Sequence, residues 1–221
     1  ENLQSQSYLN DISMWTNNQK MKINQTKSKT MVFNFTKKHQ FATRLKIDDN
    51  ILETVTQTKL LGTIVTNDLK WDENTNHIVK KAYARMEMLR RLSGFQAPQS
   101  DLKHVYIVYI RSLLEQSCNV WHSSLTLQNE NDLERVQKVA VKLILKDKYQ
   151  DYQTALNILD LETLKDRREE LCLKFAQKCL KNPKMKHLFP NNENTQETRK
   201  HEHFKVLFAK TSRLKDSPII Y

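Results

Sequence analysis

The chain has 221 residues, 38% of them hydrophobic and 28% charged, and its 36 lysines and arginines against 25 acidic residues give a net charge of +11. This length suits one domain or two small ones, and only two glycines and four prolines argue against a turn-rich all-β fold and a glycine-rich phosphate loop. The charge indicates a polyanionic partner, nucleic acid first and a membrane surface second, although a merely soluble basic protein can carry it too.

The first seventy residues carry the signals of a small α+β domain. Apolar residues near helical spacing predict a helix over residues 3–17, and alternating apolar residues predict a strand over 29–35. Residues 45–55 surround the turn formers Asp48-Asp49-Asn50, which is a hairpin pattern, and 60–65 is predicted to form another strand. We therefore expect one helix and a small antiparallel sheet over residues 1–70. The apolar face of the helix comprises Leu3, Tyr8, Leu9, Ile12 and Trp15.

After Trp71 the period of the apolar residues changes from two to about 3.6, which predicts an all-helical module over residues 71–190. Gly94 is placed to end its first helix, and Asn182-Pro183 to end its last. The expected inward faces include Tyr109 and Phe175. The predicted helices run over 73–92, from Ser100 or Asp101, from Asp132, around Leu156 and Leu159, and from Leu164 to Leu180.

Residues 191–221 are predicted to be a polar loop and a C-terminal tail, in which Phe204–Phe208 is a candidate short element. The three cysteines lie in apolar segments without zinc-ligand spacing, which indicates buried thiols in a reducing compartment. No apolar run approaches membrane-spanning length and no signal-peptide pattern opens the sequence. We expect no membrane partner, no bound metal, and an intracellular location, nuclear or cytoplasmic.

Some residues that can carry chemistry are assigned to packing instead. His122 precedes Ser123-Ser124, but no nucleophile-elbow pattern surrounds it, so a packed or capping role is expected. His201 and His203 form only an isolated pair, which is weak evidence for a metal. Packing roles are likewise expected for Trp15, Trp71 and Trp121.

Several short sequence motifs follow one another along the chain in a specific order. Asn24-Gln25-Thr26-Lys27-Ser28 fits an Asn-x-x-Lys-Ser/Thr loop, Leu61-Gly62 is a Leu-Gly element, and a basic helix over 80–91 follows. In this order the chain resembles the back half of the reverse transcriptase of non-LTR (LINE-type) retrotransposons. Further phrases that look like this family are Val105–Ser112, Val120–Ser124, Leu133–Lys138, Arg167-Arg168 and Arg213–Ile219.

The resemblance implies that residues 1–70 are the C-terminal part of a polymerase palm and 71–190 its thumb and connection. Lys27 would then lie near the phosphates of the incoming nucleotide, as an accessory catalytic group that offsets charge or protonates pyrophosphate. Leu61 and Gly62 would approach the primer strand. The alternatives are a solvated loop lysine and a glycine bulge in a strand.

In this family two Mg²⁺ ions bind to carboxylates of an aromatic-x-Asp-Asp hairpin that precedes the N-terminal helix seen here. The one adjacent aspartate pair of this chain, Asp48-Asp49, follows Lys27 and has the pattern of a turn. We therefore expect no cofactor in this chain, Mg²⁺ in the intact parent polymerase, and no polymerase activity from this chain alone.

A basic face on the first helix of the helical module indicates phosphate binding. Such a helix can lie along a near-A-form RNA/DNA hybrid and neutralise its backbone without reading its sequence, although an ordinary solvated face has the same pattern. The face comprises Lys80, Lys81, Arg85, Arg90 and Arg91, and a second basic strip comprises Lys138, Lys142, Lys146 and Lys148.

The resemblance and the charge together predict a C-terminal fragment of an RNA-directed DNA polymerase that grips template–primer. Its partners would be the RNA/DNA template–primer and the rest of the polymerase chain. One alternative is a non-enzymatic helical nucleic-acid-binding or scaffold protein derived from a retroelement remnant. Another is a helical protein-interaction adaptor whose charge only keeps it soluble.

Overall fold

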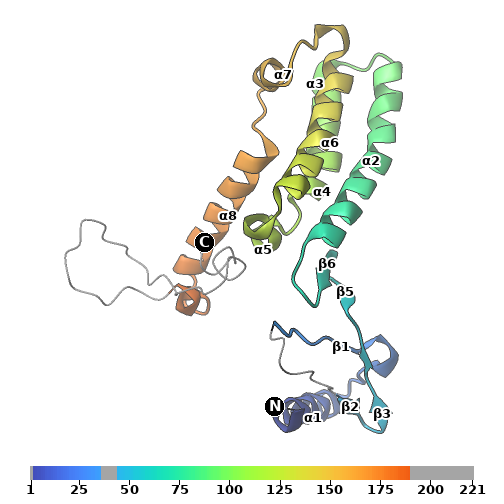
Figure 1. The fold of residues 1–221 in the computed structure, drawn as a ribbon, viewed down its shortest axis with the longest axis vertical. Coiled ribbons are helices and arrows are strands. Elements are labelled where there is room, and N and C mark those ends of the chain that lie inside the picture. The colour runs from blue at the N-terminus through green and yellow to red at the C-terminus, as the bar shows by residue number, and fades with distance from the viewer. Residues whose placement is uncertain (1, 36–43, 190–221) are drawn as a thin grey trace, which may run out of the picture. The chain divides into compact units, whose positions relative to one another are not determined.

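The computed structural model describes residues 2–35 and 44–189, and the chain divides into two compact units, Glu1–Lys70 and Trp71–Tyr221. Where it is described, the first unit combines helix with short strands and the second is helical (Figure 1). The protein is therefore a mixed α+β chain whose strands precede its helical module. The predictions for 191–221, including Phe204–Phe208 and His201, concern residues outside the described ranges. None of the described helices is long and apolar enough to cross a membrane.

The first unit contains a long helix, a 3₁₀ turn and short strands that pair two by two. β1 pairs with β4 in parallel, whereas β2 with β3 and β5 with β6 are antiparallel. The prediction of one antiparallel sheet is therefore wrong in detail, because alternation shows that a segment is a strand but not which partner it pairs with. The elements are α1 (Asn2–Asn18), the turn Gln25–Lys27, β1 (Lys29–Thr30), β2 (Lys46–Ile47), β3 (Asn50–Ile51), β4 (Glu53–Thr54), β5 (Gln57–Leu60) and β6 (Thr63–Thr66).

Helix α1 forms where it was predicted, but it packs through a different face. The amide of Gln6 pairs with the backbone of Lys46 in β2, donating to its carbonyl at 2.8 Å and accepting from its N–H at 2.9 Å. Tyr8, Ile12 and Trp15 remain more than half exposed. The expected packing role of Trp15 and the predicted inward face are therefore wrong, because a polar backbone contact decides the orientation of this helix.

The strand and hairpin predictions for the first unit have different outcomes. Asp48-Asp49 forms the turn between β2 and β3, as predicted, with Asp48 at a φ of 51°. The strand expected over 60–65 is instead a hairpin, because Leu61 and Gly62 form a tight turn between β5 and β6. The strand expected over 29–35 ends at Thr30, since β1 pairs with β4 at only two positions.

The second unit is built from helices that follow the predicted order. Its first helix ends at Gly94 and its last at Lys181 beside Asn182, as expected. The third predicted helix begins at Leu127 rather than Asp132, because the Thr126 hydroxyl caps it by accepting the N–H of Asn129 at 3.2 Å. The elements are α2 (Asp72–Gly94), α3 (Gln99–Val105), the π-helical segment η2 (Tyr106–Arg111), α4 (Ser112–Glu115), α5 (Cys118–Trp121), η3 (His122–Ser124), α6 (Leu127–Leu145), η4 (Lys146–Lys148), α7 (Tyr152–Leu159), α8 (Leu164–Lys181) and η5 (Lys186–Leu188).

The π-helical segment η2 changes which residues of the second predicted helix face inward. Tyr106 and Ile110 are fully buried, whereas Tyr109, predicted inward, is 41% exposed. A π-helix widens the turn, so residues beyond it shift around the helix relative to a regular 3.6-residue period. Phe175 on α8 is also 42% exposed, contrary to prediction, because the neighbours of α8 cover little of its second half.

The core of the second unit lies where α2, α6 and the continuous helical segment from α3 to α4 pack side by side (Figure 1). Alpha-helix α5 packs against α8, and α7 against α6. Trp71 and Trp121 are buried, which confirms their packing role. The fully buried apolar side chains of these helices include Ala82, Met86, Leu89, Tyr106, Ile110, Leu114, Leu133, Val136 and Ala140.

A buried polar network joins four segments of this core. The Gln137 side chain on α6 is completely buried; its carbonyl accepts from the Tyr106 hydroxyl, and its amide donates to Tyr152 Oη at 2.8 Å and to the Glu162 carbonyl at 2.9 Å. The Tyr152 hydroxyl in turn donates to Glu134, whose carboxylate accepts the N–H of Leu164 at the start of α8. Burial raises the pKa of both tyrosines, so both stay protonated donors at neutral pH.

Replacing Gln137 with leucine should destabilise the second unit strongly. Leucine keeps the volume but leaves the Tyr106 hydroxyl and the Glu162 carbonyl buried without partners, at a cost of about 2–4 kcal/mol. Urea unfolding monitored by circular dichroism measures this cost. The matched change Gln128→Leu, on the exposed face of the same helix, should alter stability by no more than about 0.5 kcal/mol. Equal effects of the two changes would contradict this role of the network.

Candidate nucleic-acid interface

Lys27 stands at the end of a tight turn that Asn24 organises. The Asn24 side-chain oxygen accepts the backbone N–H of Lys27 at 3.1 Å and the hydroxyl of Thr26 at 2.7 Å, and the Ser28 hydroxyl donates to the Asn24 carbonyl at 2.9 Å. The Asn-x-x-Lys-Ser spacing is thus the spacing of a capped 3₁₀ turn. This turn leaves the Lys27 ammonium exposed, with no ion-pair partner among the residues that the structure describes.

The turn is fixed to the β2–β3 hairpin by the intervening Gln25. The Gln25 amide donates to the carboxylate of Asp48 at 2.7 Å and accepts from the side chain of Asn50. Lys29, by contrast, forms an ion pair with Glu53 of the neighbouring strand β4. Of the two lysines flanking Ser28, only Lys27 therefore remains available to an external anion.

Leu61 and Gly62 form the tip of the β5–β6 hairpin. Both residues have positive φ, 48° and 93°, as a two-residue turn that follows the strand twist requires. Gly62 adopts this conformation easily, whereas Leu61 is strained in it. The Leu61 side chain is 90% exposed. The hairpin thus presents a strained, solvent-facing leucine at its tip.

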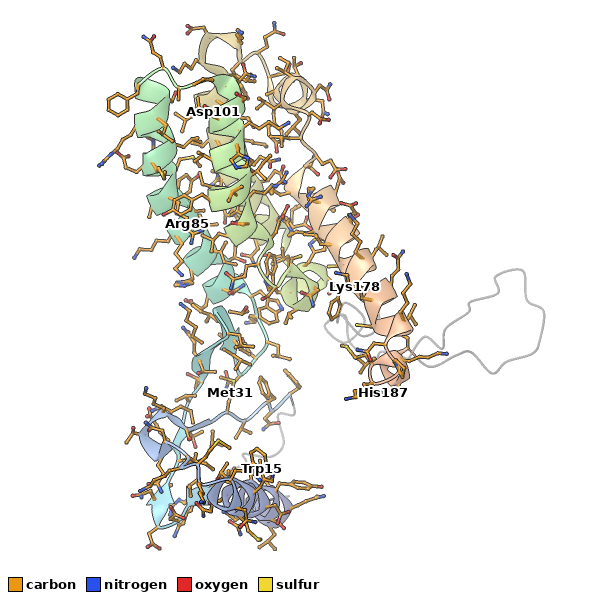
Figure 2. All side chains as sticks on the ribbon, turned by 180° about the vertical axis from the view of Figure 1, so that it is seen from behind. Trp15, Met31, Arg85, Asp101, Lys178 and His187 are labelled. Carbon is orange, nitrogen blue, oxygen red and sulfur yellow. The ribbon has the colours of Figure 1, made fainter. Side chains whose placement is uncertain are left out.

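The five cations predicted on α2 do not have equal status. Lys80 and Lys81 are exposed and have no carboxylate partner in the described part of the chain. Arg90 and Arg91 share Glu87, at 3.5 and 3.3 Å. The fifth, Arg85, lies in the middle of α2, where Figure 2 labels it.

Arg85 is engaged inside the second unit. Its Nη1 donates to the backbone carbonyl of Tyr109 at 2.6 Å, and its guanidinium lies over the Tyr109 ring, 4.6 Å from the ring centroid. The Arg85 guanidinium therefore covers one face of the Tyr109 ring, although the residue as a whole remains partly exposed. Arg85 therefore fixes α2 against η2, and its charge is less available to phosphate than the charges of Lys80 and Lys81.

The second basic strip is largely used to hold the helical module together. The ammonium groups of Lys138 and Lys142 lie over the rings of Tyr152 and Tyr149, at 5.2 and 5.0 Å from the centroids. Lys146 donates to the carbonyl of Ser93 at the end of α2, at 2.6 Å. This leaves Lys148 as the member of the strip without such a contact among the described residues. The strip is a weaker candidate for phosphate binding than α2.

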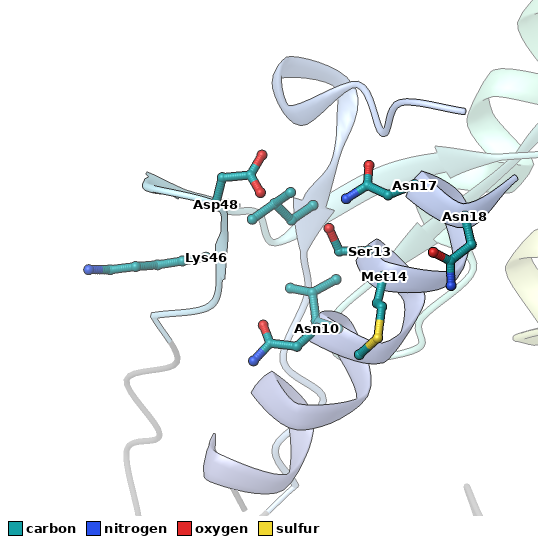
Figure 3. Close-up of a pocket in the computed structure, with 9 residues that line it drawn as sticks. Asn10, Ser13, Met14, Asn17, Asn18, Lys46 and Asp48 are labelled. Atoms are coloured by element: carbon teal, nitrogen blue, oxygen red, sulfur yellow. The ribbon is translucent and has the colours of Figure 1, made fainter. Parts of the chain in front are cut away.

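A polar hollow of about 330 Å³ lies between α1 and the β2–β3 hairpin in the first unit (Figure 3). Asn10, Ser13 and Asn17 of α1 line it, together with Lys46 and Asp48. It offers one carboxylate, that of Asp48, which Gln25 already engages. The described residues contain no group of three or more His, Cys, Asp or Glu side chains suited to a metal ion.

His122 has the packed role that was predicted, beside a buried arginine. Arg168 is fully buried in α8, donates from Nε to His122 Nδ1 at 3.3 Å, and lies 5.9 Å from the Trp121 ring. Neither of its terminal Nη groups has a hydrogen-bond partner among the described residues. Burial and the adjacent Arg168 charge lower the pKa of His122 to about 4. The imidazole is therefore neutral at pH 7.

The exposed ammonium groups of Lys27, Lys80 and Lys81 suit the binding of phosphates. Sequence reasoning found the cations of α2 but missed that Tyr109 engages Arg85, because the π-helical segment that turns Tyr109 outward has no evident sequence signal. It also missed that Asn24 builds the Lys27 turn, although the spacing of an N-cap residue three positions before Lys27 contained that signal.

In the comparisons with known proteins, the chain matches no protein family, no curated protein and no solved structure.

The second unit should lose stability as pH falls from about 6.5 to about 4. The unfolded chain binds a proton on His122 below its ordinary pKa of 6.5, whereas the folded chain resists it down to about 4. Because the lowered pKa favours the neutral form, its stabilisation is complete above pH 6.5 and declines below it, by up to about 3 kcal/mol. Urea unfolding at a series of pH values measures this decline.

His122→Asn provides the comparison, since its side-chain oxygen can still accept from Arg168. This variant should show a flatter profile between pH 6.5 and 4. His104→Asn should keep the parent profile, because His104 is exposed in the folded chain. A parent-like slope in His122→Asn would show that other groups cause the acid sensitivity.

Proposed function

We propose that this chain is the C-terminal palm and thumb portion of a LINE-type RNA-directed DNA polymerase and that it grips the RNA/DNA template–primer. Residues 1–70 correspond in this proposal to the end of the palm, and the helices from α2 onward to the thumb and connection. The support is the ordered series of motifs in the sequence, together with the local geometry of three of them: the Lys27 turn, the Leu61-Gly62 hairpin tip and the basic face of α2. A nuclear or cytoplasmic location accompanies this proposal.

The observation that carries the proposal is the pair of unpartnered lysines on α2. Lys80 and Lys81 are exposed on a helix whose opposite face is buried, and no described carboxylate neutralises them. A rigid helix with adjacent ammonium groups can neutralise backbone phosphates without contacting base edges. The net charge of +11 attracts any nucleic acid, and these two side chains supply specific contacts.

Lys27 supports the polymerase assignment through its presentation. The capped turn holds its backbone in place, while the ammonium group remains exposed and unpaired among the described residues. In a complete polymerase such a lysine would contact the phosphates of the incoming nucleotide and stabilise the charge of the leaving pyrophosphate. We propose this accessory role for Lys27 only in the intact enzyme.

Leu61 supports a contact between the hairpin tip and the primer strand. A leucine at a φ of 48° is strained by about 1 kcal/mol, and its 90% exposed side chain gains nothing from packing within the chain. Residues with a strained backbone whose side chains make no packing contacts within the chain often belong to binding sites. With Gly62 beside it, the tip allows close approach of a nucleic-acid backbone.

A stripe of exposed apolar side chains on α1 is consistent with the proposal that the rest of the polymerase chain is a partner. Tyr8, Ile12 and Trp15 are 61%, 52% and 57% exposed and follow one another at helical spacing. An apolar stripe of this kind is suited to cover by further protein. The front half of the palm, which holds the catalytic carboxylates in this family, is the proposed cover.

The Mg²⁺ ions of the parent reaction do not fit the described residues of this chain. No suitable ligand group occurs among them, and the carboxylate of Asp48 supports the Lys27 turn. No catalytic step is therefore assigned to residues of this chain beyond the accessory role of Lys27. The alternative, a non-enzymatic nucleic-acid-binding protein derived from a retroelement, would use the same α2 surface.

The double variant Lys80→Ala/Lys81→Ala tests the proposed grip. Binding of the full chain to a fluorescent RNA/DNA hybrid is measured by anisotropy at several salt concentrations. Loss of two phosphate contacts should weaken binding about tenfold and make the slope of log K against log salt shallower by about 2. Parent protein should also bind the hybrid more tightly than a single strand of equal length.

The matched control is Lys174→Ala/Lys178→Ala on α8, which removes the same charge elsewhere. Lys174 is paired with Glu170 at 2.6 Å, and Figure 2 labels Lys178 near the end of α8. This control should keep a slope close to that of the parent. If both double variants lose the same amount of slope, the charge acts non-specifically and α2 is not the binding surface. Salt-insensitive behaviour, equal in the parent and the Lys80→Ala/Lys81→Ala variant, would favour the adaptor interpretation.

Leu61→Asn separates binding from stability at the hairpin tip. Asparagine tolerates positive φ, so the change should stabilise the first unit by about 1 kcal/mol in urea unfolding. If the tip contacts nucleic acid, the same variant should bind the hybrid less tightly. Leu69→Asn, at another leucine with positive φ, should leave hybrid affinity unchanged. Unchanged or tighter binding by Leu61→Asn would remove the tip from the proposed site.

A further inference from the structure

Two cysteines from different helices meet inside the second unit. Cys118 begins α5 and is 3% exposed, and Cys172 lies on α8, which packs against α5. Both are free thiols, and their side chains interact with each other. The third cysteine, Cys179, is also buried, about two turns further along α8. The chain thus contains one pair of interacting thiols and one separate buried thiol.

The surroundings of the pair favour a thiolate on Cys172. The buried guanidinium of Arg168, one turn earlier on α8, acts on both sulfurs, and its two Nη groups have no hydrogen-bond partner among the described residues. The interaction with Cys118 lowers the pKa of Cys172, whereas the same interaction and burial raise the pKa of Cys118. The two thiols are therefore differentiated, one toward the nucleophilic form and one toward the protonated form.

A small cavity gives Cys172 access to solvent-borne reagents. The cavity, of about 60 Å³, is lined by Cys172, Leu173 and Phe175 of α8 and by Asn119 and Ser123 from the α5–η3 segment, among others. A space of this size admits molecules as small as one or two waters. Cys172 itself is half-buried, while Cys118 behind it is nearly closed to solvent.

We propose that Cys172 and Cys118 form a peroxide-sensitive thiol pair, in which Cys172 is the oxidised residue and Cys118 converts it to an intramolecular disulfide. The site takes small hydroperoxides, of which hydrogen peroxide is the simplest. It is independent of the proposed nucleic-acid function, because none of its residues belongs to α2 or to the first unit.

The reaction proceeds in two balanced steps. The Cys172 thiolate attacks one oxygen of hydrogen peroxide, so that an S–O bond forms, the O–O bond breaks and hydroxide leaves. The Cys118 sulfur then attacks the Cys172 sulfenic sulfur; the S–S bond forms, the S–O bond breaks, and the released hydroxide takes up the Cys118 proton as water. Two thiols are oxidised and one peroxide is reduced to two waters.

The product covalently joins α5 to α8. These helices pack against each other but are far apart in the chain, so a bond between Cys118 and Cys172 closes a long loop. Closing a long loop restricts the unfolded chain and should raise the melting temperature of the second unit by about 5–10 °C. In a reducing compartment the pair would rest as thiols and form the bond only under oxidative load.

The test treats the full native chain with dilute hydrogen peroxide, alkylates the remaining thiols after unfolding, and maps the peptides by mass spectrometry. The expected result is a monomer with a Cys118–Cys172 linked peptide, an alkylated Cys179, and reversal by dithiothreitol. Before oxidation, Cys172 should react with an alkylating reagent at least about tenfold faster than Cys179.

Single variants separate the two roles. Cys118→Ser should leave Cys172 as a sulfenic acid that a dimedone-type reagent traps, and Cys172→Ser should leave Cys118 reduced. Cys179→Ser should form the disulfide as the parent does. Oxidation that spreads equally over all three cysteines, disulfide-linked dimers, or trapping on Cys118 in place of Cys172 would overturn the proposal.

Discussion

The fold of the helical unit depends on one buried amide. Gln137 has no exposed surface, and its hydrogen bonds to Tyr106, Tyr152 and the Glu162 carbonyl join η2, α6, α7 and the segment before α8. Buried polar groups tolerate only the arrangement that satisfies them, so this network selects one register for each of these segments. That register turns Tyr109 outward beneath Arg85 and places α8 against α5.

The large positive charge of the chain is divided between internal and external tasks. Arg85, Lys142 and Lys146 are bound to rings or carbonyls of neighbouring helices, and Arg168 is buried beside His122. These cations help the module hold its shape. Other cations, among them Lys80 and Lys81, face solvent without described counter-charges. The surface available to a polyanion is therefore narrower than the composition suggests, which makes it testable by a few substitutions.

The candidate functions use different parts of the molecule. Phosphate binding is proposed for α2 and for the two turns of the first unit, whereas the thiol pair lies between α5 and α8. The proposed phosphate-binding surface and the thiol pair have one feature in common. Each contains a polar group that the fold holds in place without giving it a complete set of interaction partners. Among the described residues, Lys27 and Lys80 have no carboxylate partner, and two nitrogens of Arg168 have no hydrogen-bond partner. Groups of this kind are where a stable scaffold retains capacity for external chemistry.

Local spacing is sufficient to predict the α+β class, the position of most helices, the Asp48-Asp49 turn and the basic pattern on α2, because each depends on residues close together in the chain. Contacts between elements depend on the folded arrangement, which spacing does not encode. The bond between Gln6 and the Lys46 backbone exposes Trp15, and a π-helical segment exposes Tyr109. Which strands pair, and which lysines and arginines have an interaction partner within the chain, likewise depend on residues distant in the chain. Local patterns fix elements through backbone energetics, whereas faces and sites are fixed by contacts that form only when those elements pack.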